Sequence, residues 1–305
     1  MNLGIKSTIL ATAITAICMT QAFAGSESYN FGENNNKVIK AQTAGGDFTA
    51  PGDVKIDFYG HMAFKITSPK GLTMMIDPWR NDPTGAFGVW YPKDFPEVPV
   101  DIAMSTHAHF DHDALYRTHA AMNLERIAGT FQLGDVKISG IADKHQCHAP
   151  GEINWTKYLK NTFSLDLEKM CPDKSPMSWD NVIYVVETGG LRIGFWGDNR
   201  PDPGPKAVEM LKDLDVLIMN IDGSGHILSY AQVDSILERF KPKTVIPGHY
   251  LGPAVPASSL KTADEWVDQQ ADVVKLGAAE WVVNPATVNG KSKSVYYFGS
   301  NYKSE

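Results

Sequence analysis

A short stretch of the chain concentrates side chains that bind metal ions. Residues 105–113 read S-T-H-A-H-F-D-H-D and include His107, His109, Asp111 and His112. At the histidine frequency of this chain, such an H-x-H-x-D-H pattern arises by chance in on the order of one sequence in a thousand. Neutral imidazoles and a carboxylate are good ligands for a borderline divalent ion, and a tight loop aims them in two directions. The stretch therefore predicts two metal ions rather than a polar turn with solvated histidines.

Ligand-type residues also follow apolar runs elsewhere in the chain. Several of these runs have the alternation or the length of strands, namely 54–66, 72–76, 100–104, 136–141, 191–196, 216–219 and 244–246. The runs at 182–186 and 191–196 are expected to form a hairpin. Residues that accompany these runs are His61, Asp77, His145, Asp198 and His249. We expect helices at 113–122, 205–214 and 230–240, and a last helix from Thr262, capped through Glu265, with Trp266, Val273 and Val274 facing the core. Strands alternating with helices predict an α/β fold whose strand-end loops present the site.

The order of these residues resembles the metallo-β-lactamase superfamily, whose pattern is H-x-H-x-D-H, a distant His, an Asp after Gly, and a last His. The resemblance covers roughly residues 54–250. Its Gly60-His61, Ile76-Asp77-Pro78 and Pro247-Gly248-His249-Tyr250 segments look most like the branch that contains ascorbate-6-phosphate lactonase. The resemblance implies an αβ/βα four-layer sandwich with the site at the edge between two sheets. It also implies that one ion binds His107, His109 and His145, the other binds Asp111, His112 and His249, and Asp198 bridges them.

Several assignments stay open at this point. His148 lies three residues after His145 and is an alternative ligand, although His145 directly follows a predicted strand. His61, Asp77 and His226 are candidates for orienting ligands or contacting substrate. The alternative for each of the three is a hydrogen-bonded structural residue.

The chemistry implied by two adjacent ions is hydrolysis. Two divalent ions, zinc with manganese or iron as alternatives, hold a bridging water and turn it into a hydroxide nucleophile near neutral pH. Asp111 would orient that nucleophile and carry a proton. The chain has no phosphate-cradling glycine loop and no G-x-S-x-G motif, so we expect no organic cofactor. Members that hydrolyse β-lactams usually have Cys or Ser where Asp198 stands, so we expect a small ester, lactone or phosphodiester substrate.

Two other functions are alternatives to hydrolysis. The first is an iron-dependent oxidoreductase on the same scaffold, but members with a flavodiiron centre normally carry Glu in place of His109. The second is a non-catalytic periplasmic protein that binds a metal ion or another ligand, which would not require Asp111. Metal analysis and a panel of substrates would separate these three possibilities.

Composition supports a folded protein that acts on small molecules. The chain has 305 residues, 28 Lys plus Arg against 35 Asp plus Glu, and a net charge of −7. Its 43% hydrophobic and 21% charged residues are typical of a globular protein. The negative charge argues against nucleic acid as a partner. Nothing in the sequence indicates an oligomeric state.

The amino terminus has the three parts of a secretory signal peptide. Residues 1–24 contain Lys6, an apolar stretch at 8–19, and Ala22-Phe23-Ala24 as a cleavage signal. The apolar stretch is short for a membrane span. We therefore expect a periplasmic or secreted protein without a stable membrane anchor after cleavage. Residues 25–52 read as a flexible linker, and residues 53–305 as a single domain.

Two further features could shape the mature protein. Cys147 and Cys171 would be exposed to an oxidising compartment, where they could pair or remain free thiols. The segment 149–180 is longer than the corresponding interval usually is in the superfamily that the chain resembles. We expect it to form either a lid over the metals or a surface excursion with its own core. The aromatic residues of this segment are Trp155, Tyr158, Phe163 and Trp179. Those of a candidate opposite wall at 85–96 are Phe87, Trp90, Tyr91 and Phe95.

Overall fold

The computed structural model describes residues 46–85, 89–147, 179–252 and 260–305, together with Lys157, Lys160, Asn161 and Ser164. The predicted signal peptide, most of the predicted linker and most of the segment 149–180 lie outside these residues, as do His148 and Cys171. Those predictions are therefore untested. Within the described residues, no helix has the length and hydropathy needed to cross a bilayer.

The first sheet has six strands and is built largely from the amino-terminal half. In spatial order its strands are β13 (Glu280–Val283), β1 (Val54–Phe58), β2 (Phe64–Thr67), β3 (Thr73–Ile76), β4 (Ile102–Ser105) and β5 (Met122–Glu125). The β1–β2 and β2–β3 pairs are antiparallel, whereas β3–β4 and β4–β5 are parallel. The sheet is thus mixed, with β13 from the carboxyl-terminal region closing one edge.

The second sheet has eight strands and contains the longest ones. In spatial order they are β12 (Val273–Lys275), β14 (Ser294–Tyr297), β11 (Thr244–Gly248), β10 (Val216–Asn220), β9 (Leu191–Phe195), β8 (Asn181–Thr188), β7 (Val136–Asp143) and β6 (Gly129–Leu133). The predicted hairpin at 182–196 is confirmed as β8 and β9. The β9–β10, β10–β11, β11–β14 and β14–β12 pairs are parallel. The β6–β7, β7–β8 and β8–β9 pairs are antiparallel.

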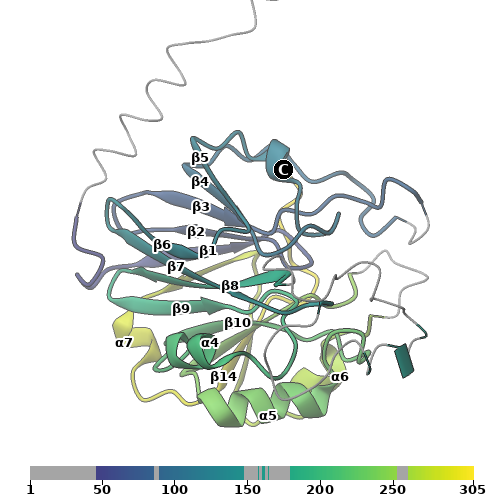
Figure 1. The fold of residues 1–305 in the computed structure, drawn as a ribbon. Coiled ribbons are helices and arrows are strands. Elements are labelled where there is room, and N and C mark those ends of the chain that lie inside the picture. The colour runs from purple at the N-terminus through teal and green to yellow at the C-terminus, as the bar shows by residue number, and fades with distance from the viewer. Residues whose placement is uncertain are drawn as a thin grey trace, which may run out of the picture. The chain divides into compact units, whose positions relative to one another are not determined.

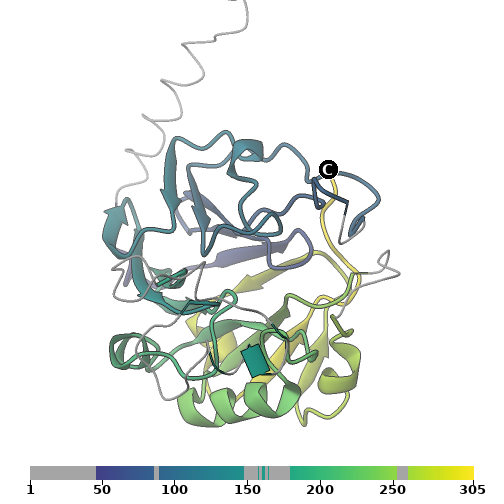
Figure 2. The ribbon, with the colours of Figure 1, turned by 45° about the vertical axis from the view of Figure 1, so that its right-hand side comes forward.

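The two sheets stack face to face around the main core (Figure 1), to which Met74 and Met104 contribute from one sheet and Phe195 and Ile218 from the other. Helices cover the outer face of the larger sheet, as Figure 2 also shows. They are α4 (Pro205–Met210), α5 (Tyr230–Phe240) and α6 (Asp264–Val267), and a short α7 (Pro285–Val288) follows later. Helix α5 has the predicted bounds and buries Val233, Ile236, Leu237 and Phe240. The predicted α/β sandwich is confirmed.

The outer face of the smaller sheet is covered differently. Met75 and Ala103 alternate with the inward-facing residues of β3 and β4 and pack in a second core with Trp79, Tyr91 and Phe95. The predicted helix at 113–122 is wrong. The chain there forms a short 3₁₀ helix, η1 (Leu115–Arg117), and then strand β5. The carbonyls of Arg117 and Thr118 accept from the backbone N–H groups of Val98 and Val100 at 2.9 and 3.1 Å, and His119 has a φ of 43°, so the chain leaves the helical conformation before β5.

The predicted last helix is also largely wrong. Helix α6 ends at Val267, and its N-cap is Ala263, which makes no side-chain capping bond, so the Thr262 and Glu265 capping box does not form. Val273 and Val274 belong to β12 and pair with β14, and Val274 is exposed. Sheet pairing places these β-branched residues in a strand despite their helical spacing.

Candidate metal centre

The predicted ligands follow strands that run in one direction. Strands β1, β3 and β4 are parallel in direction because β1–β2 and β2–β3 are antiparallel and β3–β4 is parallel. The same reasoning gives one direction to β7, β9 and β11 of the larger sheet. The residues that follow these carboxyl ends are His61, Asp77, the 105–113 stretch, His145, Asp198 and His249. The topology therefore delivers them to the same edge of each sheet.

The side chains converge in three overlapping groups in which one ligand atom per residue lies within 4.8 Å of the others. The histidine trio is His107, His109 and His145. The acidic group is His61, Asp111, His112 and His249. The third group is His107, His112 and Asp198, and it joins the other two. All seven predicted ligands are thus brought together, with His61 among them.

Asp198 lies between the trio and the acidic group. Its Oδ2 is 3.7 Å from Nε2 of His107 and 3.2 Å from Nε2 of His249, and its Oδ1 is 3.5 Å from Nε2 of His112. Asn220 donates from Nδ2 to Oδ1 of Asp198 at 3.0 Å. The preceding residue is Gly197, with φ of 60°, where a Cβ would lie 2.9 Å from Thr106 and so would not fit. This backbone carries Asp198 into a position that reaches both groups.

Hydrogen bonds fix which ring nitrogens face the centre. Nδ1 of His145 donates to the carbonyl of Asp198 at 3.0 Å, and Nδ1 of His112 donates to Oδ2 of Asp77 at 2.8 Å. The bond leaves Nε2 of His145 with its lone pair, and it leaves Nε2 of His112 as the nitrogen that would bind an ion once its proton is displaced. Within the described part of the chain, the buried Nε2 atoms of His112, His145 and His249 make no hydrogen bond. An unpaired buried polar atom costs about 1–3 kcal/mol, so this donor set fits metal ions that would satisfy it.

One buried carboxylate orients members of both groups. Oδ1 of Asp77 accepts from the backbone N–H of Thr106 at 2.7 Å, and Oδ2 accepts from Oγ1 of Thr106 at 2.7 Å as well as from His112. Oγ1 of Thr106 is in turn 3.0 Å from Nδ1 of His107. Asp77 is fully buried. It therefore sets the tautomer of His112 directly and that of His107 through Thr106.

The pKa values differ between the two groups. Burial lowers the pKa of His107 and of His145 well below the ordinary value of 6.5. Burial also opposes the charged form of His112, but Asp198, Asp111 and Asp77 outweigh it and raise its pKa to about 10. For Asp111 and Asp198, burial alone would raise the pKa, and the neighbouring histidines hold it well below 3.8. His107 and His145 are therefore neutral, whereas His112 is a protonated imidazole beside the carboxylates of Asp77, Asp111 and Asp198.

Three residues at the site have a strained backbone. His61, Asp77 and His249 are non-glycine residues with φ of 53°, 51° and 55°, a conformation that costs of order 1–3 kcal/mol each. The backbone N–H of His249 donates to the carbonyl of His61 at 2.8 Å, and Nε2 of His61 lies 3.0 Å from Oδ2 of Asp111. Burial lowers the pKa of His61 to about 4. The structure thus places His61 against the carboxylate of Asp111 rather than at a distance from the centre.

The remaining predicted site residues lie at the rim or elsewhere. His226 is half-buried on a loop shaped by Asp222, and it belongs to none of the three groups. Trp90 makes an edge contact with the ring of His61 at a centroid distance of 4.8 Å. Tyr91 and Phe95 of the same candidate wall are instead buried in the second core.

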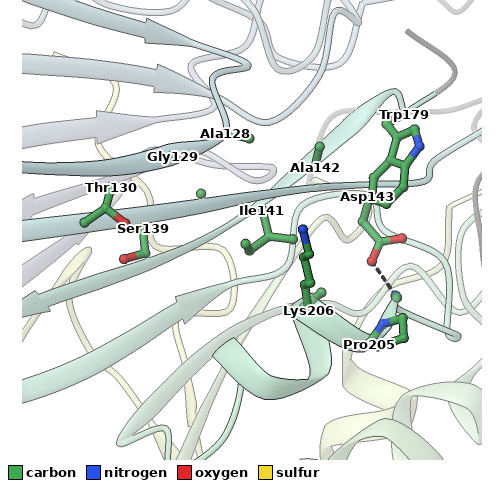
Figure 3. Close-up of a pocket in the computed structure, with 13 residues that line it drawn as sticks. Ala128, Gly129, Thr130, Ser139, Ile141, Ala142, Asp143, Trp179, Pro205 and Lys206 are labelled. Carbon is green, nitrogen blue, oxygen red and sulfur yellow. Dashed lines mark hydrogen bonds between the residues drawn. The ribbon is translucent and has the colours of Figure 1, made fainter. Parts of the chain in front are cut away.

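A cavity of about 590 Å³ lies on the outer face of the larger sheet, between β6, β7 and the start of α4 (Figure 3). Its lining includes Ile141, Trp179 and Lys206, and Asp143, whose Oδ2 accepts from the backbone N–H of Gly204 at 2.7 Å. None of the clustered histidines lines it. Trp179, in the segment expected to form either a lid over the metals or a surface excursion, therefore lines a surface away from these histidines.

Four residues that support the centre were not singled out from the sequence. Thr106 and Asn220 lie at strand ends, so the strand-end rule that found the ligands also points to them. Asp180 and Arg200 hold the loop of His145 and carry no such signal. Asp180 falls at the end of the 149–180 segment, and Arg200 two residues after Asp198.

Comparisons with known proteins agree with this geometry. Residues 55–249, more than half of the chain, match the family model described as a beta-lactamase superfamily domain. A UPF0173 metal-dependent hydrolase of Thermodesulfovibrio yellowstonii is 25% identical over 246 residues, covering 74% of this chain and 91% of that protein. Another, from Myxococcus xanthus, is 27% identical over 208 residues, covering 65% and 71%. A solved structure from Thermotoga maritima, described as a candidate zinc-dependent hydrolase of the metallo-beta-lactamase superfamily, has a TM-score of 0.55 at 18% identity and covers 80% of this chain and 98% of that one.

Proposed function

This chain belongs to the metallo-β-lactamase superfamily and is a metal-dependent hydrolase, and from that premise we propose that it binds two divalent ions and hydrolyses a small ester, lactone or phosphodiester outside the cytoplasm. The observation that carries the proposal is the convergence of seven buried or half-buried ligand-type side chains on one edge of the sandwich. Buried ring nitrogens without hydrogen bonds point to ions as their partners.

The residues divide into two binding sites. We assign one ion to the histidine trio, the other to Asp111, His112 and His249, and contacts with both to Asp198. When bound, such ions lower the pKa of water toward neutrality and polarise the bond to be cleaved. Imidazole and carboxylate ligands suit zinc, with manganese or iron as alternatives.

Asp111 is the residue we assign to the reacting water. Its pKa is held well below the ordinary value, so the carboxylate is ionised at neutral pH and accepts a hydrogen bond. His61 fixes one of its oxygens at 3.0 Å, and the other remains to orient the attacking water. The ring of Trp90 also packs against that imidazole in an edge contact.

The substrate class and the location rest on features outside the centre. A net charge of −7 disfavours a polyanionic substrate such as RNA, and the resemblance to ascorbate-6-phosphate lactonase favours lactones. Cys147 is disulfide-bonded, which supports an oxidising compartment and hence export through residues 1–24. Its pairing with Cys171 and the lid at 149–180 remain predictions.

A substrate panel with metal control tests this function. The mature protein, purified after export, is assayed on chromogenic carboxylic esters, lactones, phosphodiesters and β-lactams, before and after chelation. We expect turnover of one of the first three classes, its loss on chelation, and its return with zinc or manganese. Mock-treated protein passed through the same desalting step is the control. Turnover that survives thorough metal removal would contradict the mechanism.

A further inference from the structure

The turn that carries His145 is separate from the stretch that carries the other two members of the trio. His107 and His109 come from the loop after β4, whereas His145 comes from residues 144–147, which follow β7 in the other sheet and belong to no strand or helix. A ligand on such a turn is held only as well as the turn itself. The contacts of its backbone therefore decide how well the third member of the trio is placed.

A single carboxylate binds the amide edge of this turn. Oδ1 of Asp180 accepts from the backbone N–H of His145 at 2.7 Å, and Oδ2 accepts from those of Gln146 and Cys147 at 2.8 and 2.9 Å. The backbone N–H of Asp180 also donates to the carbonyl of Asp143 at 3.1 Å. Three charge-assisted bonds from consecutive amides make a backbone nest around an anion, here supplied by the chain itself.

A buried guanidinium binds the carbonyl edge. Nε of Arg200 donates to the carbonyl of His145, its Nη1 donates to that of His226, and its backbone N–H donates to that of Lys144 at 3.1 Å. Arg200 is 1% exposed, and burying a cation is costly unless its contacts compensate. Because Arg200 follows Asp198 by two residues, it ties the His145 turn to the segment of the bridging carboxylate.

We propose that Asp180 and Arg200 are positioning residues that act through His145 and set how tightly the histidine trio holds its ion. The proposal rests on the proposed function, since it assumes that the trio binds metal. Partners that orient a ligand typically contribute 10–100-fold in metal affinity. Loss of Asp180 would free the turn, while the Asp111, His112 and His249 site keeps its own supports.

A double-mutant cycle in zinc affinity tests the proposal. The full mature chain is titrated with zinc against a chromophoric chelator as wild type, Asp180→Ala, His145→Ala and the double variant. We expect Asp180→Ala to weaken one of two ions about 10–100-fold, and to have no further effect on zinc affinity when His145 is already alanine. Asp180→Asn and Arg200→Lys provide milder versions if Asp180→Ala does not fold, and each should weaken the same ion.

Asp135→Ala is the matched control. This carboxylate is also buried and also accepts from a loop amide, that of Lys70 at 2.9 Å, but it lies at the opposite end of β7. It should lower thermal stability and leave both zinc affinities unchanged. Wild-type affinities in folded Asp180 variants, or equal losses with and without His145, would overturn the positioning role. Failure of the wild type to bind zinc, manganese or iron would instead overturn the proposed function.

Discussion

The histidine trio and the acidic group are held in place by different means. In the trio, His145 depends on side chains that grip a loop, namely Asp180 and Arg200. In the acidic group, His249 directly follows β11 and is bonded through its backbone to the turn of His61. The acidic group also stores backbone strain and opposed charges, neither of which the trio shares to the same degree.

In the proposed centre, a site whose ligands are held by nearby side chains would therefore lie beside a site whose ligands are held by the packed core. The side chains that hold the His145 loop can be substituted one at a time. Single substitutions should therefore change the metal affinity of the trio more readily than that of the acidic group. Strand pairing and strained turns are set by the whole sandwich, so the acidic group should respond chiefly to changes in its own charges. The experiments below test that contrast, beginning with the largest effect.

Removing one residue from each half should abolish hydrolysis. For His107→Ala and Asp111→Asn we expect turnover to fall by at least about 1000-fold, because several kcal/mol of stabilisation by the ions is lost and each 1.36 kcal/mol is tenfold. Both variants should stay folded, since the stretch follows β4 as a loop. Steady-state kinetics with circular dichroism measures this. His119→Ala, an exposed histidine paired with Glu97, is the control and should keep full turnover.

Asp77→Asn should weaken both halves together. The asparagine amide would either present an N–H to Nδ1 of His112 or no longer accept from Oγ1 of Thr106. Because Thr106 in turn contacts His107, the orientation of both His112 and His107 is disturbed. We expect a 10–100-fold loss of affinity for both ions, in zinc titrations like those for Asp180. A loss confined to one ion would show that the two halves do not share this support.

Acid should release the ion of the acidic group first. His107 and His145 have lowered pKa values and stay neutral below pH 6.5, so an ion displaces no proton from them. His112, with a pKa of about 10, is protonated at neutral pH without metal, and the carboxylate of Asp198 also raises the pKa of His249. Each displaced proton weakens binding about tenfold per pH unit as the pH falls.

Two variants separate these pH dependences. His145→Ala retains the acidic group, and His249→Ala retains the trio. Zinc affinity is measured between about pH 6 and 9, where the protonation of the two groups of histidines differs. As the pH falls, we expect a steep loss of zinc affinity in His145→Ala and a gentle loss in His249→Ala. Equal slopes would mean that the charge contrast between the halves is not functional.

The sequence indicated which side chains converge better than it predicted the helices. His107, His109, Asp111 and His112 are adjacent in the chain, and the distant residues follow strands that local alternation reveals, so few long-range facts were needed. The helix expected at 113–122 failed because pairing of β5 with β4 is a tertiary choice. Likewise, Val273 and Val274 are drawn into β12 by β14, which lies some 20 residues later in the chain.

The supporting residues show a different limit. Asp77 was a candidate because it ends a buried strand, whereas Asp180 and Arg200 have no periodic or motif context. Their roles arise because the loop after β7, which carries His145, contacts Asp180 just before β8 and Arg200 after β9. Such crossings depend on the packed fold, and a single sequence does not encode them in a local pattern.

The number of zinc ions per folded chain tests the central claim most directly. The purified mature protein, loaded with zinc and desalted, is analysed by elemental mass spectrometry against protein concentration. We expect two ions per chain in the wild type and one in His145→Ala. No bound zinc, or the same single ion in both proteins, would contradict a centre built from two groups of ligands.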